Sequence, residues 1–155
     1  MNANGEAFHS PKQLVQGALY SGASILCLLL LVVVAMAQWL ALSQQFFPKC
    51  LALYGFGFMV MFVHLSKHQP HSRFGSGNQI TLARAALVAL LGGFLGESLS
   101  NTLLWYVVSF SLIGTGLDAV DGWLARREGL VSRLGARFDL EVDAFHILIL
   151  ALLAC

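Results

Sequence analysis

The stretch SGASILCLLLLVVVAMAQWLALS, residues 21–43, decides the fold class of this chain. It carries no acidic or basic side chain, and the uncharged run around it extends from Lys12 to Lys49. Since about 20 apolar helical residues cross the hydrocarbon core of a bilayer, the stretch predicts a transmembrane helix. A cleaved signal peptide is the rival interpretation, because residues 35–37 (Ala-Met-Ala) fit a small-x-small cleavage site. The apolar run continues past that site, which favours a retained helix.

The composition of the whole chain also indicates a membrane protein. Of its 155 residues, 57% are apolar and 11% are charged, and the mean hydropathy is +0.74. In a soluble domain about a quarter of the residues are charged. The net charge is +1, and the six arginines and three lysines are split among short segments, which argues against the continuous basic face of a nucleic-acid-binding protein. The three cysteines share no motif spacing, so neither a disulfide framework nor a zinc site is predicted.

Four further apolar stretches follow the first, and together they predict an all-α, polytopic membrane helix bundle with about five spans. Polar or turn-forming segments separate the stretches at 44–49, 67–79 and 97–101. Asn78 or Thr81 is expected to cap the start of the third helix. The five predicted spans are residues 21–43, 50–66, 78–97, 102–117 and 144–155.

Positive charge gathers on one side of this predicted bundle. With the N-terminus inside the cell, eight of the nine Lys and Arg residues fall on the cytoplasmic side, and only Lys49 falls outside. Because the cytoplasmic flanks of spans are enriched in Lys and Arg, residues 118–143 are expected to face the cytoplasm. Twelve residues follow Asp143, and about 18 Å of helix is short of a bilayer. The chain is therefore expected to be a fragment.

Six of the eight acidic residues lie between residues 118 and 143. Asp118 and Asp121 are three positions apart, and Asp139 and Asp143 are four apart, so each pair lies on one face of a helix. The two helices are consecutive and antiparallel, which predicts that the four carboxylates face one another near the membrane surface. An oxygen-only cluster suits hard divalent ions, so we predict Mg²⁺ or Mn²⁺ as the cofactor.

The residues between the two aspartate pairs favour a phosphate ligand. Gly122 and Ala125 leave the helix backbone open to close approach, and Arg126 supplies a planar cation for a phosphate group. Ser132 and the flexible Gly135 complete a predicted phosphate-binding connector. Metal ions, an arginine and an exposed carboxylate together indicate a phosphoryl-transfer site.

The spacing of these residues resembles the signature of the CDP-alcohol phosphatidyltransferases, D-x2-D-G-x2-A-R-x8-G-x3-D-x3-D. Every spacing is met by Asp118, Asp121, Gly122, Ala125, Arg126, Gly135, Asp139 and Asp143. The family also often carries N-x2-T-x2-R upstream, which Asn78, Thr81 and Arg84 match. The resemblance covers about residues 77–155. We therefore predict an N-terminal extension with two transmembrane helices, residues 1–72, and the N-terminal half of the family core with its first three helices, residues 73–155.

The resemblance implies that the hydroxyl of an alcohol displaces CMP from a CDP-linked lipid, usually CDP-diacylglycerol, in phospholipid synthesis. Asp118, Asp121 and Asp139 would hold the divalent metals. Asp143 would be the general base and also a ligand of a second metal. The CDP moiety would be bound by residues of both motifs, namely Asn78, Thr81, Arg84, Gly122, Ala125, Arg126 and Gly135, and by Ser132 between Arg126 and Gly135. The resemblance also implies an integral protein of the bacterial inner membrane that forms a homodimer among membrane lipids.

The acceptor alcohol stays unassigned. After Asp139 the sequence lacks the D-P-x-A-D-K pattern common in glycerophosphate-using members and the D-S pattern common in serine- and inositol-using ones. Three other interpretations remain: a solvated acidic loop, a divalent-cation path lined by the four aspartates, and an inactive membrane scaffold that keeps the motif. A cation path does not explain why Gly122, Ala125 and Arg126 are present at this spacing.

Overall fold

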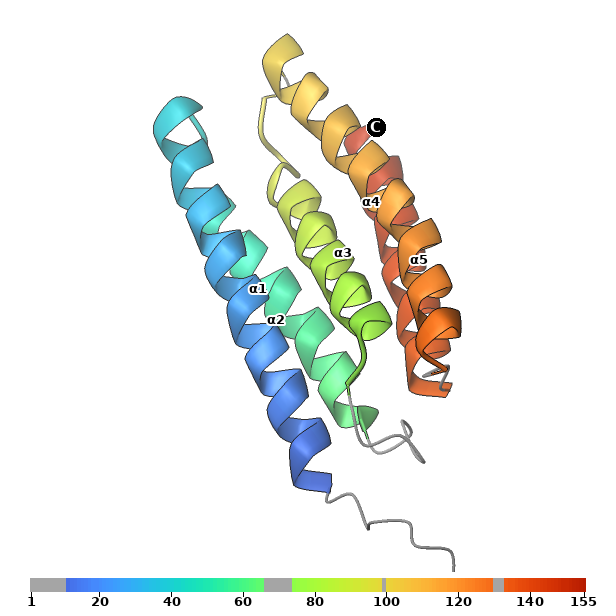
Figure 1. Cartoon of the computed structure of the whole chain (residues 1–155). Coiled ribbons are helices and arrows are strands. Elements are labelled where there is room, and N and C mark those ends of the chain that lie inside the picture. The colour runs from blue at the N-terminus through green and yellow to red at the C-terminus, as the bar shows by residue number, and fades with distance from the viewer. Residues whose placement is uncertain (1–10, 66–73, 99, 130–132) are drawn as a thin grey trace, which may run out of the picture.

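A computed structural model describes residues 11–65, 74–98, 100–129 and 133–155. Over these ranges the chain forms five helices and no strand, which confirms the predicted all-α fold (Figure 1). The helices are α1 (Pro11–Trp39), α2 (Phe46–Val63), α3 (Ser76–Gly93), α4 (Asn101–Glu128) and α5 (Arg133–Leu153).

Within the described ranges, three helices are long and apolar enough to cross a membrane: α1 over Lys12–Trp39, α2 and α4. Large apolar side chains on their outer surfaces, such as Leu31, Met59 and Leu112, are exposed. Water would solvate such surfaces poorly, whereas lipid tails solvate them well. These helices give the fold the character of a polytopic membrane bundle.

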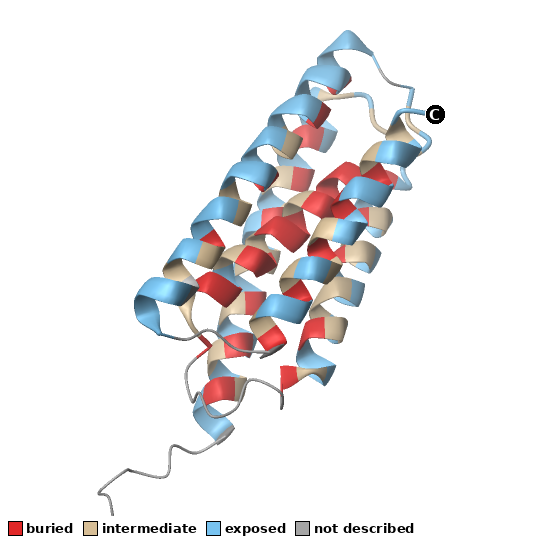
Figure 2. Cartoon of the chain, turned by 90° about the vertical axis from the view of Figure 1, so that its right-hand side faces the viewer, coloured by how far each residue is buried: buried red, intermediate tan, exposed pale blue. Residues whose placement is uncertain are grey.

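The central helix of the bundle is α3. It contacts all four other helices and lies between α1 and α2 on one side and α4 and α5 on the other (Figure 1). Most of its residues are buried, including the polar residues Asn78, Thr81 and Arg84 (Figure 2). A helix enclosed in this way can carry polar side chains, because they face protein groups and not lipid.

Glycines allow neighbouring helices to approach closely. A Cβ atom at Gly93 of α3 would lie 2.5 Å from Sγ of Cys50 and 2.8 Å from the ring of Phe46, both on α2. A Cβ atom at Gly22 of α1 would lie 2.2 Å from the ring of Phe58. The small residues therefore set the distance between α1, α2 and α3, as is common in membrane bundles.

Two glutamates form hydrogen bonds with serines at or near the ends of other helices. Glu97 accepts a hydrogen bond of 2.9 Å from the backbone N–H of Ser43, in the turn between α1 and α2. Glu128, the last residue of α4, accepts one of 3.0 Å from the N–H of Ser76, the first residue of α3. In both cases the serine hydroxyl also donates to the same carboxylate. Each glutamate therefore holds a chain segment more than fifty residues away from it in sequence.

The helix limits correct several predictions. The third helix begins at Ser76, so Asn78 and Thr81 lie inside it and do not cap it, and Glu128 satisfies its first N–H group instead. The segment 44–49 is not a turn throughout, because α2 already begins at Phe46. Pro48 is compatible with the first turn of a helix, where its missing N–H group has no partner to lose.

The acidic segment is more helical than predicted. The fourth span was expected to end at Leu117, but α4 continues to Glu128. The α5 helix begins at Arg133, so Gly135 lies in its first turn and not in a flexible connector. The signature residues therefore lie on two helices, α4 and α5.

Candidate active site

Helices α4 and α5 bring the four predicted aspartates together. Carboxylate oxygens of Asp118, Asp121 and Asp139 lie within 4.8 Å of one another. Asp143, one turn after Asp139 on α5, contacts the same arginine as the other three. Asp121 is buried at 4% exposure, whereas Asp118, Asp139 and Asp143 are between 33% and 43% exposed. The cluster is therefore closed on the side of Asp121 and open on the other.

Arg84 of α3 lies at the centre of this cluster. Its Nη1 atom is 2.8 Å from Oδ1 of Asp118 and 2.8 Å from Oδ2 of Asp121, and it also contacts Asp139. Its Nη2 atom contacts Asp143. The side chain of Arg84 is 2% exposed, so these ion pairs are shielded from water on the arginine side. Four carboxylates face one guanidinium, which leaves an excess of negative charge when all of them are ionised.

Thr81 and Asn78 lie beside Arg84 on α3, as the N-x2-T-x2-R spacing requires. The hydroxyl of Thr81 lies 3.0 Å from Oδ2 of Asp121 and 3.2 Å from the carbonyl oxygen of Gly77. The side chain of Asn78 donates to the carbonyl oxygen of Phe74, two residues before the start of α3. Thr81 thus belongs to the aspartate cluster, and Asn78 holds the chain that leads into α3.

The donor set of this cluster fits a hard divalent cation. Its possible ligands are carboxylate oxygens from two helices, with no sulfur among them. Asp139 lies near the start of α5, outside the three apolar helices named above. The pKa of its carboxyl is raised to about 6, mainly by burial and also by the charge of Asp121, while Arg84 opposes the shift. A divalent cation would favour the ionised form of such a carboxyl and offset the excess negative charge.

The glycine and arginine after Asp121 lie together on α4. A Cβ atom at Gly122 would be 3.3 Å from Nη1 of Arg126, so the arginine side chain folds back over the glycine. Arg126 is exposed, and its guanidinium remains accessible to a ligand. Ala125 is on the same helix, and Gly135 is in the first turn of α5. Ser132 lies outside the described residues.

The two acidic residues outside the signature are not in the cluster. Glu128 binds Ser76, as described above, and Glu141 forms an exposed pair with Arg137, with Nε and Oε1 3.3 Å apart. Neither of them occupies a fixed position of the signature.

Two features of the site were not predicted. Arg84 was expected to bind the CDP moiety, and its contacts with all four carboxylates had no signal in the sequence. His146 of α5 is buried close to the cluster, and it follows Asp139 and Asp143 at helix spacing. The positions 139, 143 and 146 share one helix face, a signal that was present in the sequence.

A comparison with protein families gives an independent view of the same region. The model of the CDP-alcohol phosphatidyltransferase family matches residues 74–155, just over half of the chain. The matched region contains every site residue predicted above. No curated protein and no solved structure matched the chain at a significant level.

Proposed function

This chain belongs to the CDP-alcohol phosphatidyltransferase family, and from that membership we propose that it transfers a phosphatidyl group from a CDP-linked lipid such as CDP-diacylglycerol to an alcohol, with release of CMP. The observation that carries the proposal is the group of three carboxylates within 4.8 Å of one another, inside the region that the family model matches. Carboxylates arranged in this way suit the Mg²⁺ or Mn²⁺ that would accompany a pyrophosphate substrate.

The proposed reaction is a displacement at phosphorus. The alcohol oxygen forms a bond to the phosphorus atom of the phosphatidyl group, and the bond from that phosphorus to the oxygen of CMP breaks. The proton of the alcohol passes to Asp143, which is 39% exposed and accepts it as a general base. CMP leaves with the electron pair of the broken bond.

Asp118, Asp121 and Asp139 would hold the divalent metal, with Asp143 as a further ligand. When bound, the metal supplies charge stabilisation for the pyrophosphate and for the leaving CMP. Thr81 keeps the buried carboxylate of Asp121 in place through their 3.0 Å contact. The role of the four aspartates is to fix the position of the substrate phosphates.

The cationic side chains would bind the phosphates of CDP. Arg126 is exposed, and its guanidinium lies over Gly122, where it would meet a phosphate that approaches this part of α4. Arg84 would contribute once an incoming cation takes over the carboxylates that it now contacts. Asn78, Ala125, Gly135 and Ser132 are proposed as further residues around the CDP moiety.

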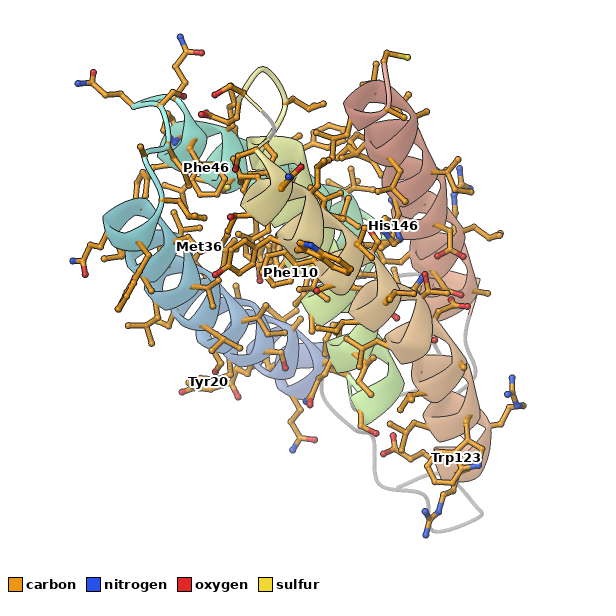
Figure 3. All side chains as sticks on the ribbon, turned by 90° about the horizontal axis from the view of Figure 1, so that it is seen from above. Tyr20, Met36, Phe46, Phe110, Trp123 and His146 are labelled. Carbon is orange, nitrogen blue, oxygen red and sulfur yellow. The ribbon has the colours of Figure 1, made fainter. Side chains whose placement is uncertain are left out.

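We also propose that the protein resides in the bacterial inner membrane with this site on the cytoplasmic side. Arg126 and Arg127 lie at the same end of α4 as the aspartates, and the guanidinium of Arg127 is 5.0 Å from the ring centroid of Trp123 (Figure 3). Basic and aromatic side chains are typical of the cytoplasmic membrane interface. The α1 and α2 helices, outside the matched region, would form a membrane-anchored extension within residues 1–72, and two copies would associate as a homodimer.

CMP release tests the proposal directly. The purified chain is incubated with CDP-diacylglycerol and glycerol 3-phosphate, L-serine or myo-inositol, with Mn²⁺ or with EDTA. We expect CMP release that requires both the metal and one of the alcohols, and unchanged release from Glu141→Gln, which alters an acidic residue outside the cluster. A folded chain that releases no metal-dependent CMP with any alcohol would contradict the proposal.

A divalent-cation path is less well supported. Arg84 contacts all four carboxylates, and a fixed positive charge at that point opposes the passage of another cation. Uptake of Mn²⁺ into proteoliposomes would be the result that favours this alternative.

A further inference from the structure

His146 is a buried polar residue that the proposed reaction does not use. It lies on α5 with 8% exposure, and within the described part of the chain its Nε2 atom has no hydrogen-bond partner. Its ring is on the side of α5 that faces the other helices (Figure 3). Buried polar atoms usually have a partner, and an ionisable side chain within a membrane bundle commonly marks a functional site.

The position of His146 relates it to the aspartate cluster. It follows Asp143 by three residues, so the two side chains share one face of α5. Across the helix interface it faces Gly114, where a Cβ atom would lie 3.2 Å from Cε1 of the histidine. Gly114 precedes Asp118 by four residues, which is one helical turn. The ring therefore occupies the next layer of the bundle, directly beyond the carboxylates, in space that the glycine leaves open.

Among the described residues, a second buried polar atom without a partner is Nε of Arg84. Arg84 and His146 are both neighbours of Asp143: Nη2 of Arg84 contacts its carboxylate, and His146 follows it by three residues on α5. One side of the aspartate cluster thus carries a hydrogen-bond donor, Nε–H of Arg84, and a ring nitrogen that donates or accepts according to its tautomer. Neither atom has a hydrogen-bond partner among the described protein groups, so each is free to bind a polar group of a ligand.

We propose that His146 and Arg84 bind a hydroxyl group of the acceptor alcohol, beside the hydroxyl that reacts at Asp143. A hydroxyl accepts from Nε–H of Arg84 and donates to Nε2 of His146, or accepts from it in the other tautomer. Three residues of helix separate His146 from Asp143 by about 4.5 Å along the axis. A polyhydroxy acceptor spans that distance with two of its oxygens, and it enters past the partly exposed Asp143. His146 is then a residue that determines acceptor specificity.

This inference rests on the proposed transfer to an alcohol, and its test separates the two. Three variants are compared with the wild-type chain: His146→Leu, which keeps the volume and removes the polar atoms, His146→Gln, which keeps a polar side chain, and Ile149→Val as the control. Ile149 is buried one turn further along the same face and has no polar atom. His146→Ala is the second variant should His146→Leu not fold.

We expect His146→Leu to raise the KM for the alcohol at least tenfold and to leave the KM for CDP-diacylglycerol within twofold. His146→Gln should recover most of that loss, and Ile149→Val should change neither constant. An unchanged KM for the alcohol in folded His146→Leu overturns the inference, as does an equal rise in both constants, which would indicate a purely structural role.

A binding measurement covers the case in which turnover is absent. The thermal shift that glycerol 3-phosphate or myo-inositol produces in the presence of Mn²⁺ should be present in the wild-type chain and lost in His146→Leu. A wild-type chain that binds the alcohol but releases no CMP would contradict the proposed function alone. A shift that persists in His146→Leu would contradict the inference alone.

Discussion

Arg84 and Asp121 form the most buried ion pair in the described part of the chain, at 2% and 4% exposure, with Nη1 and Oδ2 2.8 Å apart. The pair joins the central helix α3 to α4, and through the same guanidinium to Asp139 and Asp143 of α5. A single side chain thus holds three helices at the site.

Arg84→Gln should therefore destabilise the protein strongly. Removing one partner of a buried ion pair leaves an uncompensated charge, at a cost of about 3–5 kcal/mol. We expect a large fall in the midpoint of thermal unfolding in detergent without divalent metal. Arg137→Gln, which breaks an exposed pair with Glu141, should cost about 0.5 kcal/mol or less. Equal effects of the two variants would contradict a structural role of Arg84.

Divalent metal should stabilise the wild-type chain. A ligand that binds only the folded state at 100 times its Kd adds about 2.7 kcal/mol to the free energy of unfolding. We expect Mn²⁺ to raise the unfolding midpoint, and Asp139→Asn to abolish the rise because it removes a carboxylate of the cluster. Glu141→Gln, two residues away on the same helix, is the matched control and should respond like the wild type.

Asp143→Asn should separate turnover from metal binding. Loss of a general base lowers the rate roughly 10²–10⁴-fold, whereas Asp118, Asp121 and Asp139 would still hold the metal. The expected result is CMP release close to the background rate together with a retained part of the Mn²⁺-induced thermal shift. Undiminished CMP release would refute the role of Asp143 as base.

Gly93→Ala tests the close packing of α2 on α3. The new methyl group would meet Cys50 and Phe46 at 2.5 and 2.8 Å, and overpacking of this kind costs typically 1–3 kcal/mol. Gly116→Ala on α4 is the matched control, because a Cβ atom there meets nothing within 4 Å. Its higher helix propensity should add up to about 1 kcal/mol of stability. Thermal unfolding should therefore shift in opposite directions for the two variants.

Glu128→Gln should loosen the start of α3 without affecting the carboxylate cluster. The carboxylate of Glu128 binds the N–H and the hydroxyl of Ser76, and loss of a helix cap costs about 1 kcal/mol. Because the contact is exposed, the effect on the unfolding midpoint should be smaller than that of Arg84→Gln. A Mn²⁺-induced thermal shift equal to that of the wild type would show that the metal site is intact.

Much of the fold follows from local properties of the sequence. Charge-free apolar runs predicted the helices, and the spacings of Asp118 with Asp121 and of Asp139 with Asp143 predicted which carboxylates share a face. Helix ends were less predictable, because α4 and α5 extend through polar residues that favour no particular boundary. The cap of α3 comes from Glu128, more than fifty residues later in the chain, and no pattern around Ser76 indicates it.

The least predictable part of the site was the position of Arg84. A long side chain can reach several neighbours, and which of them it meets depends on how α3 is rotated against α4 and α5. Nothing in residues 76–93 alone fixes that rotation. The spacing of His146 from Asp139 and Asp143 already indicated that the three residues share a helix face. It did not indicate that the histidine is buried, because histidines are found both inside proteins and on their surfaces.

The central place of α3 also bears on the order of biosynthesis. Because α3 precedes α4 and α5 in the chain, the ribosome delivers the guanidinium of Arg84 before any of the four carboxylates. When α4 and α5 are synthesised, the arginine that pairs with their aspartates is already part of the nascent chain. Because translation runs from α3 to α5, the four carboxylates are never synthesised before the arginine that pairs with them.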